Sequence, residues 1–166
     1  MPTPVLPQTG SPSTLEPVRF NMMTGHDGFL PHSPHRVLYQ GELYPSAFHL
    51  FEALKFLRNE RHDIAARIRE MENPADVHPL SERMKEYAKE GFERELMEYM
   101  DEALYLKFTQ HPDLRDQLLN TGVADLIYAE ATDPVWGEGT LGQGMNHLGI
   151  ALRRLRERLR AELAGQ

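Results

Sequence analysis

The sequence predicts one α+β domain that is mostly helical and carries a small β-sheet. Its 166 residues, of which 40% are hydrophobic and 26% charged, suit a globular protein with a single core. Apolar residues recur at helical spacing over most of the chain beyond residue 46. The extended pattern that is typical of strands is confined to two short stretches, 36–45 and 125–130.

The composition excludes several classes of protein. The formal net charge is −7, so the surface as a whole repels nucleic acid and anionic lipid. The chain has no cysteine, which excludes disulfides, thiol nucleophiles and cysteine metal sites. No apolar run approaches the ~20 residues that cross a bilayer, and the N-terminus lacks the pattern of a signal peptide. We therefore expect a cytoplasmic or nuclear protein that does not act in a membrane.

The N-terminal residues differ in composition from the rest of the chain. Seven of the twelve prolines lie in residues 1–34, and residues 1–17 combine proline with serine, threonine and glycine. Such a stretch favours irregular structure. We expect residues 1–26 to form an irregular arm and residues 27–164 to form the domain.

Strand and helix signals then follow one another along the chain. A hairpin is predicted within 36–45, where two short extended pieces turn at Gln40 and Gly41. Ser46 comes next and can cap the N-terminus of a helix. A third strand is predicted at 125–130. Apolar spacing and helix-ending residues predict helices at 47–58, 62–72, 75–88, 90–110, 113–122 and from Asn146 to the end.

Residues 133–149, "DPVWGEGTLGQGMNHLG", hold five of the twelve glycines and the only tryptophan, Trp136. A dinucleotide-binding glycine loop needs a further strand after its helix, and a P-loop needs a lysine and a hydroxyl residue after its last glycine, so both are rejected. Two interpretations stay open. The glycine N–H groups and the start of the next helix could hold an anion while Trp136 stacks on a heterocycle. The alternative is a tight turn around a core tryptophan.

Several segments resemble one family in the same order along the chain. The pattern D-x-x-W-G-x-G, then G-x-G-x-N-x-L-G, over 133–149 closely resembles the C-terminal signature of the NADAR (YbiA-like) N-glycosidase family. Further upstream, "GFLPHSPHRVLYQGELYP" (28–45), "LYPSAFHLFEALKF" (43–56) and "EALYLKFTQHPDLRDQLLNTGVADLIYA" (102–129) are similar to other segments of that family. The resemblance covers about residues 28–160 and implies a single YbiA-like domain.

The resemblance also implies a reaction. Members of this family cleave N-glycosidic bonds of phosphorylated ribosyl compounds, including riboflavin-pathway intermediates and ADP-ribose attached to guanine. A similar activity here implies a small phosphorylated riboside or ADP-ribosyl compound as the partner, no cofactor, and nucleic acid only as an ADP-ribosylated substrate. We expect Arg36 to hold a phosphate. The residues expected to bind the substrate are Trp136, Gly137, Gly139, Asn146, His49 and Arg36.

The chain departs from the family at one position that the chemistry needs. The family has a glutamate directly before the histidine that matches His49, and here that residue is Phe48. Glu52 stands where the family has glutamine, one turn or ~5–6 Å along the same helix face, and Lys55 follows on that face. We expect Glu52, Lys55 and Asp133 to be catalytic, with Glu52 as acid or base and Lys55 as nucleophile or electrostatic partner. The alternative is that Glu52 and Lys55 form only a half-exposed ion pair.

Three functions stay open at this point. The chain is an N-glycosidase, a module that binds a nucleotide-like ligand after losing hydrolysis at Phe48, or a structural domain that interacts through its proline-rich arm. No metal site is expected, because no second histidine–carboxylate pair accompanies His49 and Glu52. The arginines between 153 and 160 alternate with glutamate and are expected on a solvated helix face.

Overall fold

The structure, a computed structural model, describes residues 15–166, so residues 1–14 of the predicted arm lie outside the described residues. Six helices and four short strands follow in that range, which confirms the mostly helical α+β class. In chain order they are β1 (Val18–Phe20), β2 (Val37–Tyr39), β3 (Glu42–Tyr44), α1 (Ala47–Leu57), α2 (His62–Arg69), α3 (Val77–Arg83), α4 (Leu96–Gln110), α5 (Pro112–Asn120), β4 (Leu126–Tyr128) and α6 (His147–Ala164).

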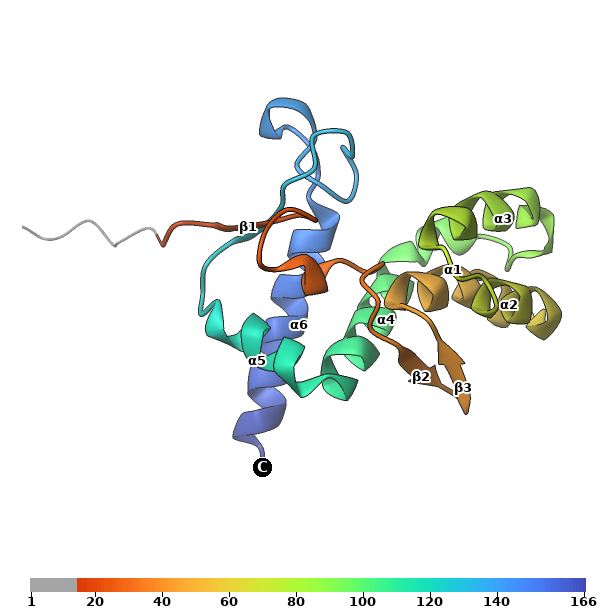
Figure 1. The fold of residues 1–166 in the computed structure, drawn as a ribbon, viewed down its shortest axis with the longest axis horizontal. Helices are drawn as coiled ribbons and strands as arrows, with labels where there is room; N and C mark the ends of the chain where they lie inside the picture. Colours follow the sequence, from red (N-terminus) through yellow and green to blue (C-terminus); the bar gives the residue numbers. More distant parts are fainter. Residues whose placement is uncertain (1–14) are drawn as a thin grey trace, which may run out of the picture.

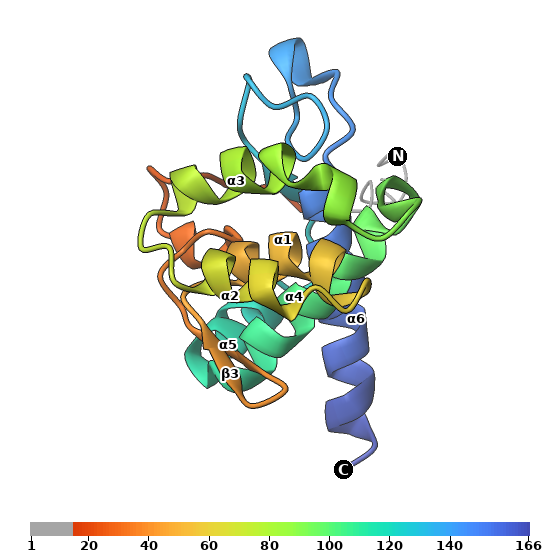
Figure 2. The ribbon, with the colours of Figure 1, turned by 90° about the vertical axis from the view of Figure 1, so that its right-hand side faces the viewer.

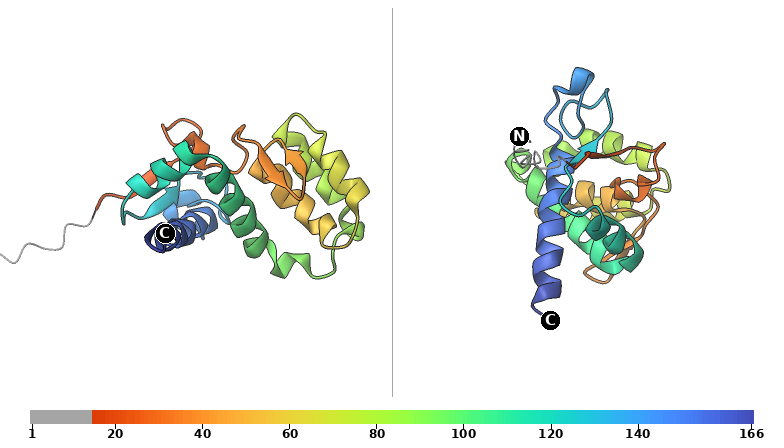
Figure 3. Two further views of the ribbon diagram at one scale, coloured as in Figure 1. Left: turned by 90° about the horizontal axis from the view of Figure 1, so that it is seen from below. Right: turned by 90° about the vertical axis from the view of Figure 1, so that its left-hand side faces the viewer.

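Helix α4 joins two groups of elements. It packs against α1 on one side and against α6 on the other. Figure 1 shows α1, α2, α3 and the β2–β3 hairpin in the first group, with α5, α6 and β1 in the second; the left panel of Figure 3 shows α4 between them. The buried residues of α4 are Tyr99, Met100, Ala103, Leu104, Lys107 and Phe108. No helix within residues 15–166 has the length and apolar character needed to cross a membrane.

The strands form two separate two-stranded ladders. The predicted hairpin is confirmed as antiparallel β2 and β3, and the turn places Gln40 and Gly41 at positive φ angles of 49° and 81°. The strand predicted at 125–130 is β4, which pairs in parallel with β1 so that Leu126 lies opposite Val18.

The ordered domain begins earlier than the sequence predicts. The sequence predicts an arm that extends to residue 26, but β1 lies inside that range. Phe20 of β1 is fully buried and stacks on Tyr128 of β4, with 5.7 Å between the ring centroids. The boundary is wrong for these residues because so short a strand carries no local pattern, and its pairing partner lies in the last third of the chain.

Helices α2 and α3 are shorter than predicted. Helix α2 ends at Arg69, and two residues later the carbonyl of Met71 turns to accept a hydrogen bond from Nε2 of His49 at 2.8 Å. This hydrogen bond joins α1 to the segment that follows α2, so the carbonyl of Met71 does not continue the α2 helix. The helix predicted over 75–88 is reduced to α3, which is flanked by two 3₁₀ turns at Pro74–Asp76 and Lys85–Tyr87.

The start of α1 agrees with the sequence prediction, whereas the start of α4 does not. The predicted cap of α1 is confirmed, because Oγ of Ser46 accepts a hydrogen bond from the backbone N–H of His49 at 3.2 Å. Helix α4 begins at Leu96, later than the predicted residue 90. Gly91 takes a positive φ of 79° and a short 3₁₀ turn follows it, so the chain cannot enter the helix earlier.

Residues 129–146 form a long loop between β4 and α6, called here the glycine loop. Figure 2 shows it projecting beyond α3, above the other helices, and the right panel of Figure 3 shows that α6 starts at its base. The loop therefore stands at the same end of the molecule as α3.

Candidate functional site

The glycine loop and α1 meet at Trp136. The indole contacts the Phe51 ring edge-on, with 5.6 Å between centroids and 86° between planes. Asp133 shapes the loop, because its Oδ1 accepts hydrogen bonds from the backbone N–H groups of Val135 at 3.0 Å and Trp136 at 2.9 Å. Two segments that are distant in sequence thus form one surface.

Three adjoining hollows open along this surface, and His32 lines all of them. The first, the tryptophan hollow, has a volume of about 100 Å³. Its lining includes Pro31, Phe48, Phe51, Tyr128, Asp133 and Trp136. The second, the central hollow, has a volume of about 660 Å³, and its lining includes Phe48, Pro34, Pro74 and His78. Because Phe48 lines both, the two hollows are neighbours.

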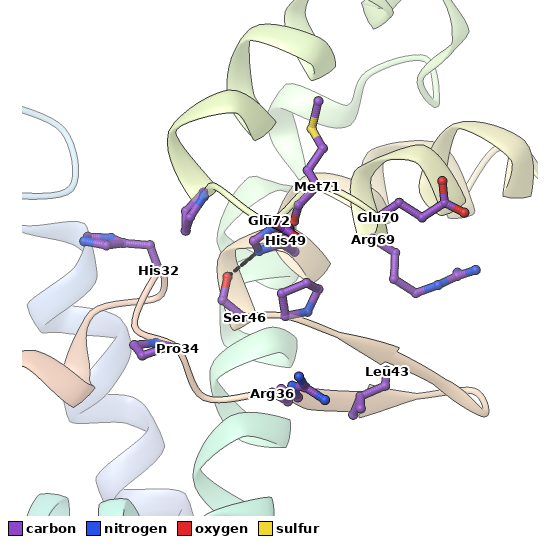
Figure 4. A pocket seen from close by; sticks show the side chains of 12 residues that line it. His32, Pro34, Arg36, Leu43, Ser46, His49, Arg69, Glu70, Met71 and Glu72 are labelled. Atoms are coloured by element: carbon purple, nitrogen blue, oxygen red, sulfur yellow. Dashed lines mark hydrogen bonds between the residues drawn. The ribbon is translucent and has the colours of Figure 1, made fainter.

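The third hollow, called the arginine hollow, has a volume of about 530 Å³. Figure 4 shows its lining, with Arg36 beside the β2–β3 hairpin and Arg69 at the end of α2, where the Arg69 side chain extends away from Ser46 and His49. The guanidinium of Arg69 also lies 3.6 Å from a carboxylate oxygen of Glu42. Two guanidinium groups suit an anion such as phosphate, although Glu70 and Glu72 line the same hollow.

A charged cluster lies inside the protein beside α1. Nζ of Lys55 is 2.7 Å from Oε2 of Glu52, and Nδ1 of His78 from α3 donates to Oε1 of the same carboxylate at 3.0 Å. Glu52 is 1% exposed and Lys55 is 4% exposed. The ion pair of the alternative interpretation is therefore present but buried instead of half-exposed, because α3 covers this face of α1.

The cluster holds Glu52 ionised. Burial would raise the pKa of Glu52, but the hydrogen bond from His78 and the charge of Lys55 outweigh burial and hold that pKa below its ordinary value. In turn, the hydrogen bond to Glu52 raises the pKa of His78. A carboxylate that stays ionised and accepts from two partners is a poor proton donor, so the predicted acid role does not suit Glu52.

Phe51 lies between Trp136 of the glycine loop and the charged cluster of Glu52, Lys55 and His78. Nζ of Lys55 lies 5.8 Å from the Phe51 ring centroid and 5.1 Å from that of Phe92. Neither Lys55 nor Glu52 lines the tryptophan hollow, which is lined by Phe48 and Phe51 instead. The structure therefore brings the charged cluster and Trp136 to one region but separates them by aromatic rings.

Two predicted substrate ligands are engaged within the protein instead. His49 is fully buried; its Nδ1 lies 2.7 Å from Oγ of Ser46, and its Nε2 donates to the carbonyl of Met71. Asn146 accepts from the N–H of Tyr128 and donates to the carbonyl of Leu126, each at 2.9 Å. Both side chains use their polar atoms to join secondary-structure elements, so neither has a ring nitrogen or amide free for a ligand.

Asn146 also takes a left-handed backbone conformation, with φ of 50°, at the start of α6. We expect Asn146→Ala to lose both hydrogen bonds and to strain this backbone, costing about 2 kcal/mol of unfolding free energy. Urea unfolding monitored by circular dichroism measures the loss. Asn146→Asp keeps the hydrogen-bond acceptor and loses the donor, so its unfolding free energy should lie between those of the wild type and Asn146→Ala. An alanine variant as stable as the wild type would contradict the bridging role.

The glycines are explained by close backbone packing within the loop. A Cβ on Gly137 would lie 2.9 Å from the carbonyl oxygens of Asp133 and Glu130. Gly139 has a positive φ of 65°, and its N–H donates to the carbonyl of Glu130. Gly137 and Gly139 are both buried. Close packing within the loop therefore accounts for both glycines, and the N–H of Gly139 is engaged inside the loop.

The sequence interpretation missed Lys107. This side chain is fully buried on α4, and its Nζ donates to the carbonyl of Leu30 at 2.7 Å and to Oγ of Ser33 at 2.6 Å. Burial lowers its pKa to about 7. Lys107 thus anchors the segment that carries His32 into the three hollows. Its place among apolar residues on the buried face of α4 was a signal for this role.

The C-terminal arginines do not all lie on a solvated face. Arg156 is buried and donates to Oγ1 of Thr121 at 2.8 Å, and Arg160 donates to the carbonyl of Gly122. These two side chains dock α6 against the C-terminal end of α5, where a cation is favourable. Arg153, Arg154 and Arg158 are exposed as expected. Within residues 15–166, no group of three or more histidine, aspartate or glutamate side chains is placed to hold a metal ion.

The fold and its motifs define a family. A family model described as the NADAR domain matches residues 17–160. The chain therefore belongs to the NADAR domain family, as its sequence motifs predict.

Its relatives are enzymes by name. N-glycosidase YbiA of Escherichia coli (strain K12) is 34% identical over 122 residues, which make up 74% of each chain. An N-glycosidase of Nostoc punctiforme is 30% identical over 128 residues, or 77% of this chain and 82% of the relative. The chloroplastic riboflavin biosynthesis protein PYRR of Zea mays is 30% identical over 140 residues, or 79% of this chain and 22% of the relative. The chain is thereby placed in a family of glycosidases.

A solved structure supports the same conclusion. The NMR structure of E. coli YbiA matches this fold with a TM-score of 0.78 and 29% sequence identity. The match covers 91% of this chain and 89% of the other. The YbiA-like fold that the sequence predicts is therefore confirmed.

Proposed function

We propose that this protein is an N-glycosidase that hydrolyses the N-glycosidic bond of a phosphorylated ribosyl or ADP-ribosyl compound. The substrate is a riboflavin-pathway intermediate or ADP-ribosylated guanine. One observation carries the proposal: the adjoining hollows have an aromatic platform at one end and two guanidinium groups at the other.

The three hollows together form a groove, and its two ends suit the base and the phosphate of such a substrate. Trp136 offers an indole on which a base can stack, worth about 1–3 kcal/mol. Arg36 and Arg69 can hold a phosphate bidentately. The ribose and the bond to be cleaved then lie across the central hollow, between Phe48 and His32.

Asp133 is proposed to act on the substrate from the tryptophan hollow, which it lines. Only its Oδ1 is used in the loop turn, so Oδ2 is available to a ribose hydroxyl or to the cationic sugar that forms as the bond breaks. Glu52 and Lys55 are proposed to supply the charge distribution beneath the groove. Lys55 acts there as an electrostatic partner, because its ammonium is buried and paired with Glu52.

A binding module is the second candidate, and one observation favours it. Phe48 stands where the family has a glutamate, and it lines both the tryptophan hollow and the central hollow. A groove that lacks this carboxylate could retain a nucleotide-like ligand without cleaving it. Binding without turnover is the expected property of such a module.

The test is release of free base. Ribosylaminopyrimidine phosphates and guanine-linked ADP-ribose are incubated with the wild type and with Glu52→Gln, Lys55→Ala and Trp136→Ala. We expect turnover by the wild type, at least 100-fold slower release in the first two variants, and a KM raised about 10-fold or more in Trp136→Ala.

The control variants are Arg153→Ala and Glu157→Gln, which remove members of an exposed ion pair on α6. They should release base at the wild-type rate. Circular dichroism of every variant separates lost chemistry from lost folding, because breaking a buried pair also destabilises the protein. If the wild type binds the ligand but releases no base, the binding module becomes the proposed function in place of the N-glycosidase.

A further inference from the structure

The central hollow lacks the carboxylate that the family places at position 48, yet it is lined by two histidines, His32 and His78. They differ in electrostatic surroundings. Burial and the charge of Lys107 lower the pKa of His32, so this ring is neutral near pH 7. The hydrogen bond to Glu52 raises the pKa of His78. His78 is therefore the residue of this pair that retains a proton closer to neutral pH.

The geometry orients His78 through one nitrogen and leaves the other accessible. Its Nδ1–H donates to Glu52, whose carboxylate is held in turn by Lys55 on the same rigid helix. Its Nε2 lies 3.9 Å from Oε1 of Glu82, which is beyond hydrogen-bond distance. The side chain is 55% exposed, so Nε2 can meet a ligand.

The charged groups that act on His78 come from two helices. Glu52 and Lys55 belong to α1, and Glu82 belongs to α3 like His78 itself. The two carboxylates favour the imidazolium and the lysine opposes it. A histidine that is oriented by a buried carboxylate at Nδ1 and free at Nε2 has the arrangement of an acid–base catalyst.

We propose that His78 is the proton donor to the departing base and takes the place of the carboxylic acid missing at position 48, with Glu52 as its positioning residue. This inference rests on the proposed N-glycosidase function. It also explains why Glu52 stands at a position where the family has glutamine, since a glutamine would give the imidazolium no opposite charge.

Proton transfer from His78 accompanies cleavage of the glycosidic bond. The Nε2–H of the imidazolium passes its proton to the departing nitrogen of the base while the C1′–N bond breaks, and the electron pair of that bond goes to the base. Water adds to C1′ from the opposite face and loses a proton, which returns to the neutral imidazole through solvent. The products are the free base and the free ribosyl compound, and His78 is again protonated.

The test compares His78→Gln with His62→Gln, a matched control at an exposed histidine on α2 that pairs with Glu60. Base release is measured from pH 5 to 9, and ligand binding is followed by the fluorescence of Trp136, the only tryptophan. We expect His78→Gln to lower kcat at least 100-fold, with KM and the binding signal changed less than threefold. The control should keep the wild-type kcat.

The pH profile separates a proton donor from a structural residue. The wild-type rate should fall above the pKa of His78, and Glu52→Gln should move that fall to lower pH because it removes the carboxylate that raises this pKa. NMR titration of the His78 ring checks the same shift without activity. The role of His78 is overturned if His78→Gln keeps the wild-type kcat. It is also overturned if the rate of Glu52→Gln falls at the same pH as the rate of the wild type. A wild type that releases no base overturns the proposed function itself, and the role of His78 falls with it.

Discussion

Gly149→Ala is expected to destabilise the protein by roughly 3 kcal/mol or more. Gly149 lies in the first turn of α6, where the helix crosses β4. A Cβ at this position would lie 2.0 Å from the carbonyl oxygen of Leu126 and about 2.5 Å from the side-chain amide of Asn146. The neighbouring atoms are backbone and a bridging amide, so the helix itself must shift.

Urea unfolding of Gly149→Ala and of a matched control, Gly165→Ala, measures this loss. Gly165 stands at the end of the same helix, and a Cβ there would lie 3.6 Å from its nearest neighbour, which is ordinary contact. The control should unfold within about 0.5 kcal/mol of the wild type. Equal stability of the two variants would show that α6 does not need its close approach to β4.

The free energy of unfolding should rise by several kcal/mol between pH 7 and 10 because of Lys107. Burial lowers the pKa of this lysine from 10.5 to about 7 in the folded protein. Between these two values the unfolded chain binds a proton that the folded chain does not, so raising the pH favours folding. Below pH 7 both states are protonated, and the contribution is absent. Each unit of pKa difference is worth about 1.4 kcal/mol.

The difference in unfolding free energy between the wild type and Lys107→Met isolates this effect, because other titrations occur in both proteins. That difference should increase with pH across the window. The control is Lys85→Met, at an exposed lysine. Its unfolding free energy should change with pH in the same way as that of the wild type. A pH-independent difference between the wild type and Lys107→Met would contradict a depressed pKa in the folded state.

The helices were predictable because their signals are local. Spacing of apolar residues and the cap at Ser46 define α1, and both are present in the sequence itself. The start of α4 was predicted wrongly because Gly91 interrupts a region of good helix formers. Strand β1 could not be predicted, because only its pairing with β4 makes it a strand.

The candidate site was predictable only in part, for the same reason. The spacing of Glu52 and Lys55 on one helix predicts their pairing, but their burial depends on α3, which no local pattern places over α1. His78 was missed because its role comes from that packing. Asn146 matches a family motif, which predicts a contact with the ligand, but its side-chain amide hydrogen-bonds to the backbone of β4. A motif identifies a residue as important without saying whether it holds a ligand or the fold.

The parallel pairing of β1 with β4 constrains the order of folding. Val18 emerges from the ribosome about a hundred residues before its partner Leu126. Until then the apolar ring of Phe20 has no place to dock, since Tyr128 is not yet made. The first strand of the domain is therefore one of the last elements to be secured, and a nascent chain stalled before β4 would leave it accessible to proteases.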